Sequence, residues 1–300
     1  MTGLHKIRII LHRSNIVYSC IPLIKIYKGR HFVKAKTVKK SQNKVIVFDL
    51  DETLGSFVDL EILWKTMLFD HTQDNFNKLM DLYPEFLRYG ILNIIDFLYY
   101  KKQMGYCYKL FIYTNNQLAK SWTSMIIKYL EQKQNTPKLF DQLICAFKIN
   151  DTVIEPKRTT HDKTYSDFIK CSLLPQSSEI CFIDDKYFKS MAQDKVYYIQ
   201  PKPYHHSLTP SEIIRRFKTF DNKDHSALLY PLFERRGSVV KSESDIEIDR
   251  RVSNKMMYHL QLFFYMTTPR RKTQRMKNSG IGKFTRKRSP RSNVFVRHHY

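Results

Sequence analysis

Two aspartates directly follow a run of apolar residues in the first sixth of the chain. The run Val45–Asp49 reads VIVFD, and the sequence continues Leu50-Asp51-Glu52-Thr53-Leu54. In an open α/β sheet, side chains just beyond the carboxyl end of a strand form the ligand site, so Asp49 and Asp51 can reach one site there. Two such carboxylates can hold a hard cation such as Mg²⁺. Alternatively, one can attack phosphorus while the other transfers a proton.

Three further segments carry groups that suit phosphate chemistry. A second apolar run ends at Thr114-Asn115, just before a predicted helix, where a hydroxyl and helix N-terminal amides can cradle an anion. A later run ends at Asp184-Asp185, and Lys163 upstream of it can neutralise phosphoryl oxygens. Each motif alone is also typical of a helix cap, a turn or a solvated loop. Their order along the chain favours one shared site.

The elements that would position these residues alternate between strands and helices. Helices are predicted over 84–103, over 118–131, over 164–173 and from Thr209, where Thr-Pro-Ser-Glu is typical of a capped helix start. Near-continuous apolar runs, typical of strands buried on both faces, predict five parallel strands: Val45–Asp49, Leu110–Thr114, Leu143–Phe147, Glu179–Ile183 and Lys195–Ile199. This alternation predicts a doubly wound, Rossmann-like α/β domain over about 44–220.

The ordered motifs resemble those of the haloacid-dehalogenase (HAD) superfamily of phosphohydrolases. Within it, the sequence Asp49-Leu50-Asp51-Glu52-Thr53-Leu54 is similar to that of the aspartate-based protein phosphatases, the NLI-interacting-factor-like or RNA polymerase C-terminal-domain phosphatase group. The resemblance covers about 44–203. It implies an α/β parallel sheet of the HAD type with a minimal cap, and a Mg²⁺-dependent phosphomonoester hydrolase.

The resemblance also implies a role for each motif residue. Asp49 would be the nucleophile that forms an aspartyl-phosphate. Asp51 would protonate the leaving group and later activate water, and Thr53 would orient the loop. Thr114 would contact the phosphoryl group, with Asn115 supporting the phosphate loop.

A lysine and a metal complete the site that the resemblance implies. Lys163 would contact the phosphoryl group and is preferred because it opens a helix, with Lys157 and Lys170 as alternatives. Mg²⁺ would be held by the side chains of three aspartates and by one backbone carbonyl: Asp49, Asp184, Asp185 and the carbonyl of Asp51.

Motif spacing bears on the substrate. Asp49 and Thr114 are 65 residues apart, and Thr114 and Lys163 are 49 apart, which leaves no room for a large cap domain. Members with open clefts act on macromolecules, so we expect a phosphoprotein substrate. The chain lacks a Trp-Trp-Pro segment, and we expect its two tryptophans, Trp64 and Trp122, to pack in the core, so the polymerase tail itself is not indicated.

Two other functions stay open. The segment 114–117 (TNNQ) resembles the T-N-Q turn of polynucleotide end phosphatases, which remove 3′-phosphates. A catalytically silent HAD-like nucleic-acid-binding protein is the non-enzymatic alternative, although every motif position here is chemically intact.

The basic residues are concentrated at the two ends of the chain. The 300 residues carry a net charge of +23, yet 45–249 sums to −2. Residues 1–44 contain 11 Lys and Arg and no acidic residue, and residues 250–300 contain 14 and none. We therefore expect a basic N-terminal extension over 1–43 and a phosphatase domain over 44–236. Residues 237–300 are expected to form a linker, over 237–249, followed by a disordered basic tail.

The basic ends could bind nucleic acid or another polyanion, or target the protein. Arg270-Arg271-Lys272 and Arg286-Lys287-Arg288 are typical of nuclear-localisation clusters. None of the five cysteines forms a C-x-x-C pair, and no apolar run is long enough to span a bilayer. We expect an intracellular, reducing location, and a nuclear or a virus-associated one stays open.

Overall fold

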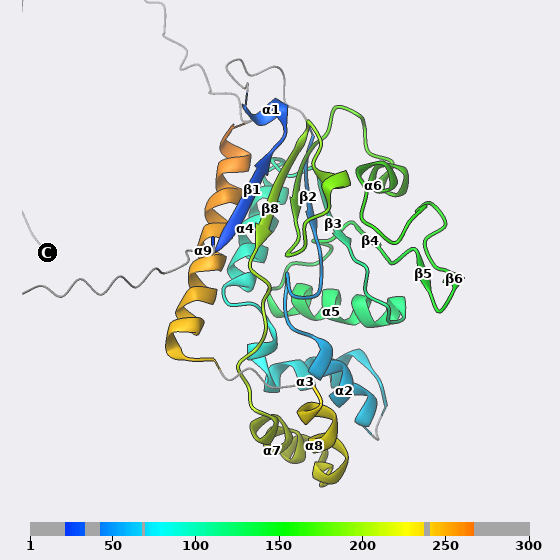
Figure 1. Cartoon of the computed structure of the whole chain (residues 1–300), viewed down its shortest axis with the longest axis vertical. Coiled ribbons are helices and arrows are strands. Elements are labelled where there is room, and N and C mark those ends of the chain that lie inside the picture. Colours follow the sequence, from blue (N-terminus) through cyan, green and yellow to red (C-terminus); the bar gives the residue numbers. More distant parts are fainter. Residues whose placement is uncertain (1–21, 34–42, 68–69, 237–240, 267–300) are drawn as a thin grey trace, which may run out of the picture. The chain divides into compact units, whose positions relative to one another are not determined.

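The structure is a computed structural model that describes residues 22–33, 43–67, 70–236 and 241–266. Its centre is a six-stranded sheet with the order β1-β8-β7-β2-β3-β4, in which every neighbouring pair except β1–β8 is parallel (Figure 1). The strands are β1 (Ile24–Lys28), β2 (Lys44–Phe48), β3 (Lys109–Tyr113), β4 (Gln142–Ile144), β7 (Glu179–Ile183) and β8 (Val196–Pro201). The α/β class and the mostly parallel sheet are thus confirmed, and the architecture is compatible with a Rossmann-like fold.

Strand β2 lies in the middle of the sheet and is buried along its whole length. Its side chains alternate between the two faces: Val45 and Val47 pack into one hydrophobic core, and Ile46 and Phe48 into the other. All five predicted strands are confirmed. The third predicted strand, Leu143–Phe147, was too long, because β4 ends at Ile144.

Strand β1 is an element that the sequence reading missed. It pairs antiparallel with β8, so that Ile26 lies opposite Ile199. Lys25 and Lys28 point to solvent while the residues between them are half-buried. An edge strand needs only one apolar face, and its lysines made this segment look like part of a basic extension. The expectation that all of 1–43 lies outside the domain is therefore wrong for β1.

The predicted helices are present, with one break. The segment 84–103 divides into a 3₁₀ turn, η1 (Pro84–Phe86), and α4 (Ile91–Gln103), separated at Gly90, whose φ of 70° suits glycine. Thr209 caps α7 by accepting a hydrogen bond from Glu212 N at 3.2 Å. The helices predicted over 118–131 and 164–173 are α5 (Lys120–Lys133) and α6 (Tyr165–Ser172), and α7 spans Pro210–Asp221.

The remaining short elements fill the connections. They are α1 (Arg30–Val33), α2 (Val58–Thr66), α3 (Gln73–Leu82), η2 (Lys189–Met191), α8 (Ser226–Glu234) and the hairpin β5–β6 (Lys148–Ile149 and Thr152–Val153).

The largest departure from prediction is α9 (Glu243–Met266), which begins inside the segment expected to be a linker. Its buried side chains recur every three or four residues, at Val252, Met256, Leu260 and Phe263, and they join the larger core. The acidic first turn and the scattered charges concealed this apolar stripe. The expected linker and tail are therefore wrong over 243–266, and the tail beyond 266 lies outside the described residues.

Helices cover both faces of the sheet (Figure 1). Helix α6 and η2 pack on one face through residues such as Phe168 and Met191. Helices α2 to α5 and α7 to α9 contribute to the core on the other. No helix among the described residues is long and apolar enough to cross a membrane.

Candidate active site

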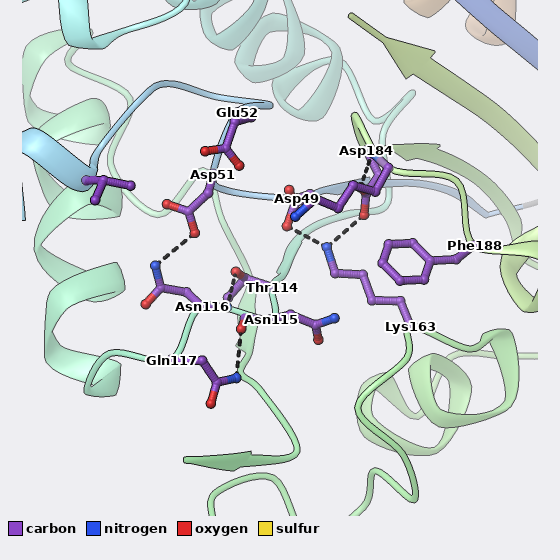
Figure 2. A pocket seen from close by; sticks show the side chains of 12 residues that line it. Asp49, Asp51, Glu52, Thr114, Asn115, Asn116, Gln117, Lys163, Asp184 and Phe188 are labelled. Atoms are coloured by element: carbon purple, nitrogen blue, oxygen red, sulfur yellow. Dashed lines mark hydrogen bonds and ion pairs between the residues drawn. The ribbon is translucent and has the colours of Figure 1, made fainter. Parts of the chain in front are cut away.

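A polar pocket of about 270 Å³ lies where the carboxyl ends of β2, β3 and β7 meet (Figure 2). This is the edge of a parallel sheet at which ligands bind. The pocket is lined mainly by polar side chains from the motifs identified in the sequence: Asp49, Asp51, Glu52, Val58, Thr114, Asn115, Asn116, Gln117, Lys163, Asp184, Lys186 and Phe188.

A buried lysine joins two of the three strand ends. Lys163 Nζ donates to Asp49 Oδ1 at 2.5 Å and to Asp184 Oδ2 at 2.7 Å, and Lys163 is only 2% exposed. Burial by itself lowers the pKa of this amine, but the two carboxylates outweigh it and raise the pKa above the ordinary value. Lys163 therefore stays charged.

Local structure explains why Lys163 points inward. The next residue, Thr164, caps α6 by accepting from Asp167 N at 3.1 Å, which fixes the entry of the chain into the helix. The Lys163 amine also lies 5.5 Å from the centre of the Phe188 ring, which walls one side of the pocket. The two alternative lysines do not line the pocket: Lys157 is exposed, and Lys170 lies 3.8 Å from Asp167.

Thr53 and Asp185 pack behind Asp49. Thr53 Oγ1 lies 3.1 Å from Asp185 Oδ1 and 3.4 Å from Asp49 Oδ2, and it accepts a hydrogen bond from Asp185 N at 3.0 Å. The hydroxyl thus links the end of β7 to the loop after β2. The loop-orienting role that the resemblance implies for Thr53 would use this contact.

The loop after β2 is held in an unusual conformation. Glu52 has a positive φ of 56°, and a Cβ at Gly55 would lie 2.5 Å from the Phe86 carbonyl oxygen, so a side chain cannot fit there. Arg88, which is 1% exposed, donates to Thr53 O at 2.6 Å and to Lys202 O at 2.9 Å. These hydrogen bonds from the buried guanidinium group stabilise the conformation of the loop.

Three buried carboxylates could hold a metal ion. Asp49, Asp184 and Asp185 each offer an oxygen, and these oxygens all lie within 4.8 Å of one another. Burial raises the pKa of Asp184 to about 8, against the attraction of Lys163, and raises that of Asp185 to about 6. When all three groups are ionised, the single charge of Lys163 does not balance theirs. A divalent cation with oxygen ligands fits both the donor set and this charge.

Asp51 belongs to a different part of the pocket. Its Oδ2 accepts a hydrogen bond from Asn116 Nδ2 at 2.8 Å (Figure 2). Asn116 is itself fixed, because its backbone N donates to Thr114 Oγ1 at 3.0 Å and its Oδ1 accepts from Leu118 N at 2.8 Å. Burial raises the pKa of Asp51 to about 7, so this carboxyl group can carry a proton near neutrality.

Asn115 faces away from Asp51 and supports the turn after β3. Its Oδ1 accepts from Arg158 Nη2 at 2.7 Å. Arg158 is also buried, and its Nη1 donates to Thr114 O at 3.2 Å and to Cys145 O at 2.7 Å. The arginine therefore fastens the ends of β3 and β4 to each other.

Sequence reasoning missed Asn116, Arg88 and Arg158 as individual site residues. A second amide after the strand was a signal for Asn116, because the turn there needs a side chain that bonds its own backbone. The two arginines gave no such signal, since each reaches the site through packing with distant segments. Trp64 and Trp122 are buried, as expected.

Comparisons of the chain with protein-family models, with curated proteins and with solved structures found no match.

Proposed function

We propose that the protein is a Mg²⁺-dependent phosphomonoester hydrolase of the HAD type, working through an aspartyl-phosphate. One observation carries the proposal: a fully buried lysine bridges Asp49 and Asp184 at the floor of a pocket that also presents Asp51 and Thr114. A nucleophile, a proton donor, a phosphate-binding hydroxyl and a fixed cation are then within one site.

In the first step, an oxygen of the Asp49 carboxylate forms a bond to phosphorus as the bond to the leaving oxygen breaks. The Asp51 carboxyl group gives its proton to that oxygen, so that the product leaves as an alcohol. Asn116 holds the Asp51 carboxyl group in place through its 2.8 Å hydrogen bond.

In the second step, Asp51 acts as a base. Its carboxylate takes a proton from water, whose oxygen bonds to phosphorus while the bond to Asp49 breaks. Inorganic phosphate leaves, Asp49 is again a carboxylate, and Asp51 again carries a proton.

Charge on the phosphoryl oxygens is met by groups of this chain. Lys163 and Thr114 line the pocket and offer an ammonium and a hydroxyl to those oxygens. Asp49, Asp184, Asp185 and the Asp51 backbone carbonyl would hold Mg²⁺, which supplies further positive charge next to the phosphoryl group.

A phosphoprotein is the substrate class that the surroundings of the pocket favour. The segment between Asp49 and Thr114 forms α2, α3 and α4, whose buried residues pack into the main core rather than into a separate cap. Among the described residues, nothing in that segment forms a second unit above the pocket. A phosphate presented by a large partner can therefore reach Asp49.

The test is a hydrolysis assay of the full chain with and without Mg²⁺. The substrates are p-nitrophenyl phosphate, a phosphoserine peptide and 3′-phosphorylated DNA. We expect Mg²⁺-dependent turnover that is lost in Asp49→Asn and kept in Asp81→Asn, a matched change at a half-exposed carboxylate paired with Lys133. Turnover by Asp49→Asn at the wild-type rate would refute the proposed nucleophile. Preference for 3′-phosphorylated DNA would replace the phosphoprotein with a polynucleotide end.

A further inference from the structure

A second pocket, of about 460 Å³, lies at the other end of the sheet. Phe264 lines this pocket, and its carbonyl oxygen accepts a hydrogen bond from Lys44 Nζ at 2.6 Å. Lys44 is the first residue of β2, whereas Asp49 directly follows the last residue of that strand. The pocket lies between the ends of α4 and α9. It is lined by five aromatic residues, one lysine and one glutamine: Phe97, Tyr100, Lys101, Tyr106, Gln261, Phe264 and Tyr265.

Three of these side chains are exposed to solvent. Tyr100 is 55% exposed, Tyr106 is 42% exposed and Tyr265 is 65% exposed. The backbone N–H groups of Tyr106 and Cys107 both donate to Lys101 O, at 2.9 and 3.1 Å, which folds the loop after α4 back and presents the Tyr106 ring. A cluster of exposed rings beside a hollow is typical of a binding surface rather than of ordinary solvated surface.

The charge of this surface is positive. The Lys101 amine lies 5.2 Å from the centres of both the Phe97 and the Tyr106 rings, and no acidic residue lines the pocket. Soon after Tyr265, the sequence enters 270–300, which contains eleven Lys and Arg and no acidic residue. The positive charge of the pocket and the basic sequence beyond it both favour an anionic ligand.

We propose that this aromatic surface, formed by Tyr100, Lys101, Tyr106 and Tyr265, binds single-stranded nucleic acid. Unpaired bases stack on the tyrosine rings, and the Lys101 ammonium group neutralises a phosphate of the strand. Duplex bases are already stacked on one another and cannot use the rings in this way. The surface is separate from Asp49 and its neighbours, so this binding does not depend on the proposed hydrolysis.

Fluorescence anisotropy of a labelled oligothymidine with the full chain, at one fixed salt concentration, tests the proposal. Each single Tyr→Ala change at 100, 106 or 265 should weaken binding about tenfold, and the triple change on the order of a hundredfold. Tyr230→Ala, at a tyrosine of α8 that is 37% exposed, is the matched control and should bind like the wild type. Asp49→Asn should also bind like the wild type.

Two further variants separate stacking from charge. The triple Tyr→Phe variant keeps the rings and should bind within about twofold of the wild type, since stacking needs no hydroxyl. Lys101→Gln should reduce the slope of log affinity against log salt by about one, whereas the triple Tyr→Ala variant should leave that slope unchanged.

Several results would overturn the proposal. Wild-type affinity in the triple Tyr→Ala variant would show that the rings do not take part. Equal binding of a duplex, or equally effective competition by polyglutamate, would show capture of any polyanion by the basic segments alone. Loss of binding in the triple Tyr→Phe variant would show that the hydroxyl groups, not stacking, carry the interaction.

Discussion

Two lysines are buried at opposite ends of β2, and their surroundings differ. Lys163 lies against Asp49, just past the carboxyl end of the strand, and Lys44 is the first residue at the amino end. Both are almost inaccessible, at 2% and 6% exposure. Lys163 contacts two carboxylates, and its pKa is raised. Lys44 donates to the carbonyl of Phe264, and its amine lies near the rings of Phe263 and Phe264. Burial lowers the pKa of Lys44 to about 8, although the negative charge of Glu179 raises it.

The difference shows that burial of a charged residue does not by itself mark a catalytic site. At the carboxyl end, the lysine lies in a cluster of three buried carboxylates that could hold a metal ion. At the amino end, the lysine donates to the neutral carbonyl group of Phe264 and so links α9 to the sheet. The groups that a buried lysine contacts, rather than its burial, therefore indicate its function.

The largest effect is expected for Lys163→Met. Removing the ammonium leaves Asp49 and Asp184 buried without their cation, so the free energy of unfolding should fall by about 3–5 kcal/mol in metal-free buffer. Turnover should fall by a factor of at least about 10². Chemical denaturation with and without Mg²⁺ checks the first point, and Mg²⁺ should restore part of the stability. An unchanged unfolding free energy without metal would contradict the reading of the cluster.

Phe263→Ala tests the amino end. Phe263 is fully buried against the larger core, so its loss should cost about 3–5 kcal/mol of unfolding free energy. Because the Phe263 ring lies near Lys44, at the opposite end of β2 from Asp49, turnover per folded molecule should stay within about twofold of the wild type. Chemical denaturation measures the unfolding free energy. An aryl-phosphate assay, at a temperature where the variant is folded, measures the turnover. A large loss of turnover there would break the separation between the two ends.

The pH dependence of stability tests Lys44. Its pKa is about 8 in the folded protein and near 10.4 when unfolded, so between these values the unfolded state binds more protons. The free energy of unfolding should therefore rise with pH across this window, by about 3 kcal/mol at most. Below pH 8, Lys44 should not make the free energy of unfolding depend on pH. Lys44→Met should remove that rise. Equal slopes for wild type and variant would show that other groups cause it.

The smallest effect is expected for Asn116→Ala, which removes the hydrogen bond to Asp51. Turnover should fall about tenfold, with a change in stability below about 1 kcal/mol. If Asn116 positions the proton donor, the loss should be greater for phenyl phosphate than for p-nitrophenyl phosphate, whose leaving group needs less protonation. Equal losses for both substrates would assign Asn116 a merely structural part.

The sequence was most informative where local pattern and burial agree. Strands buried on both faces, such as β2 and β7, are near-continuous apolar runs, and their polar ends give the candidate site. Strand β1 and helix α9 bury only one side, so lysines and acidic residues on the other side obscured them. Arg88 and Arg158 could not be predicted, because each bonds backbone carbonyls that the fold brings from distant segments.

The antiparallel edge strand β1 has a consequence for synthesis of the chain. Its partner β8 lies more than 160 residues later, since Ile24 pairs with Pro201. While the ribosome is still adding the residues between them, β1 has no strand to pair with, and Asp49 lacks Lys163 and Asp184. The sheet edge, the candidate site and the α9 packing therefore all assemble late, which predicts slow folding and a prolonged need for protection from aggregation in the nascent chain.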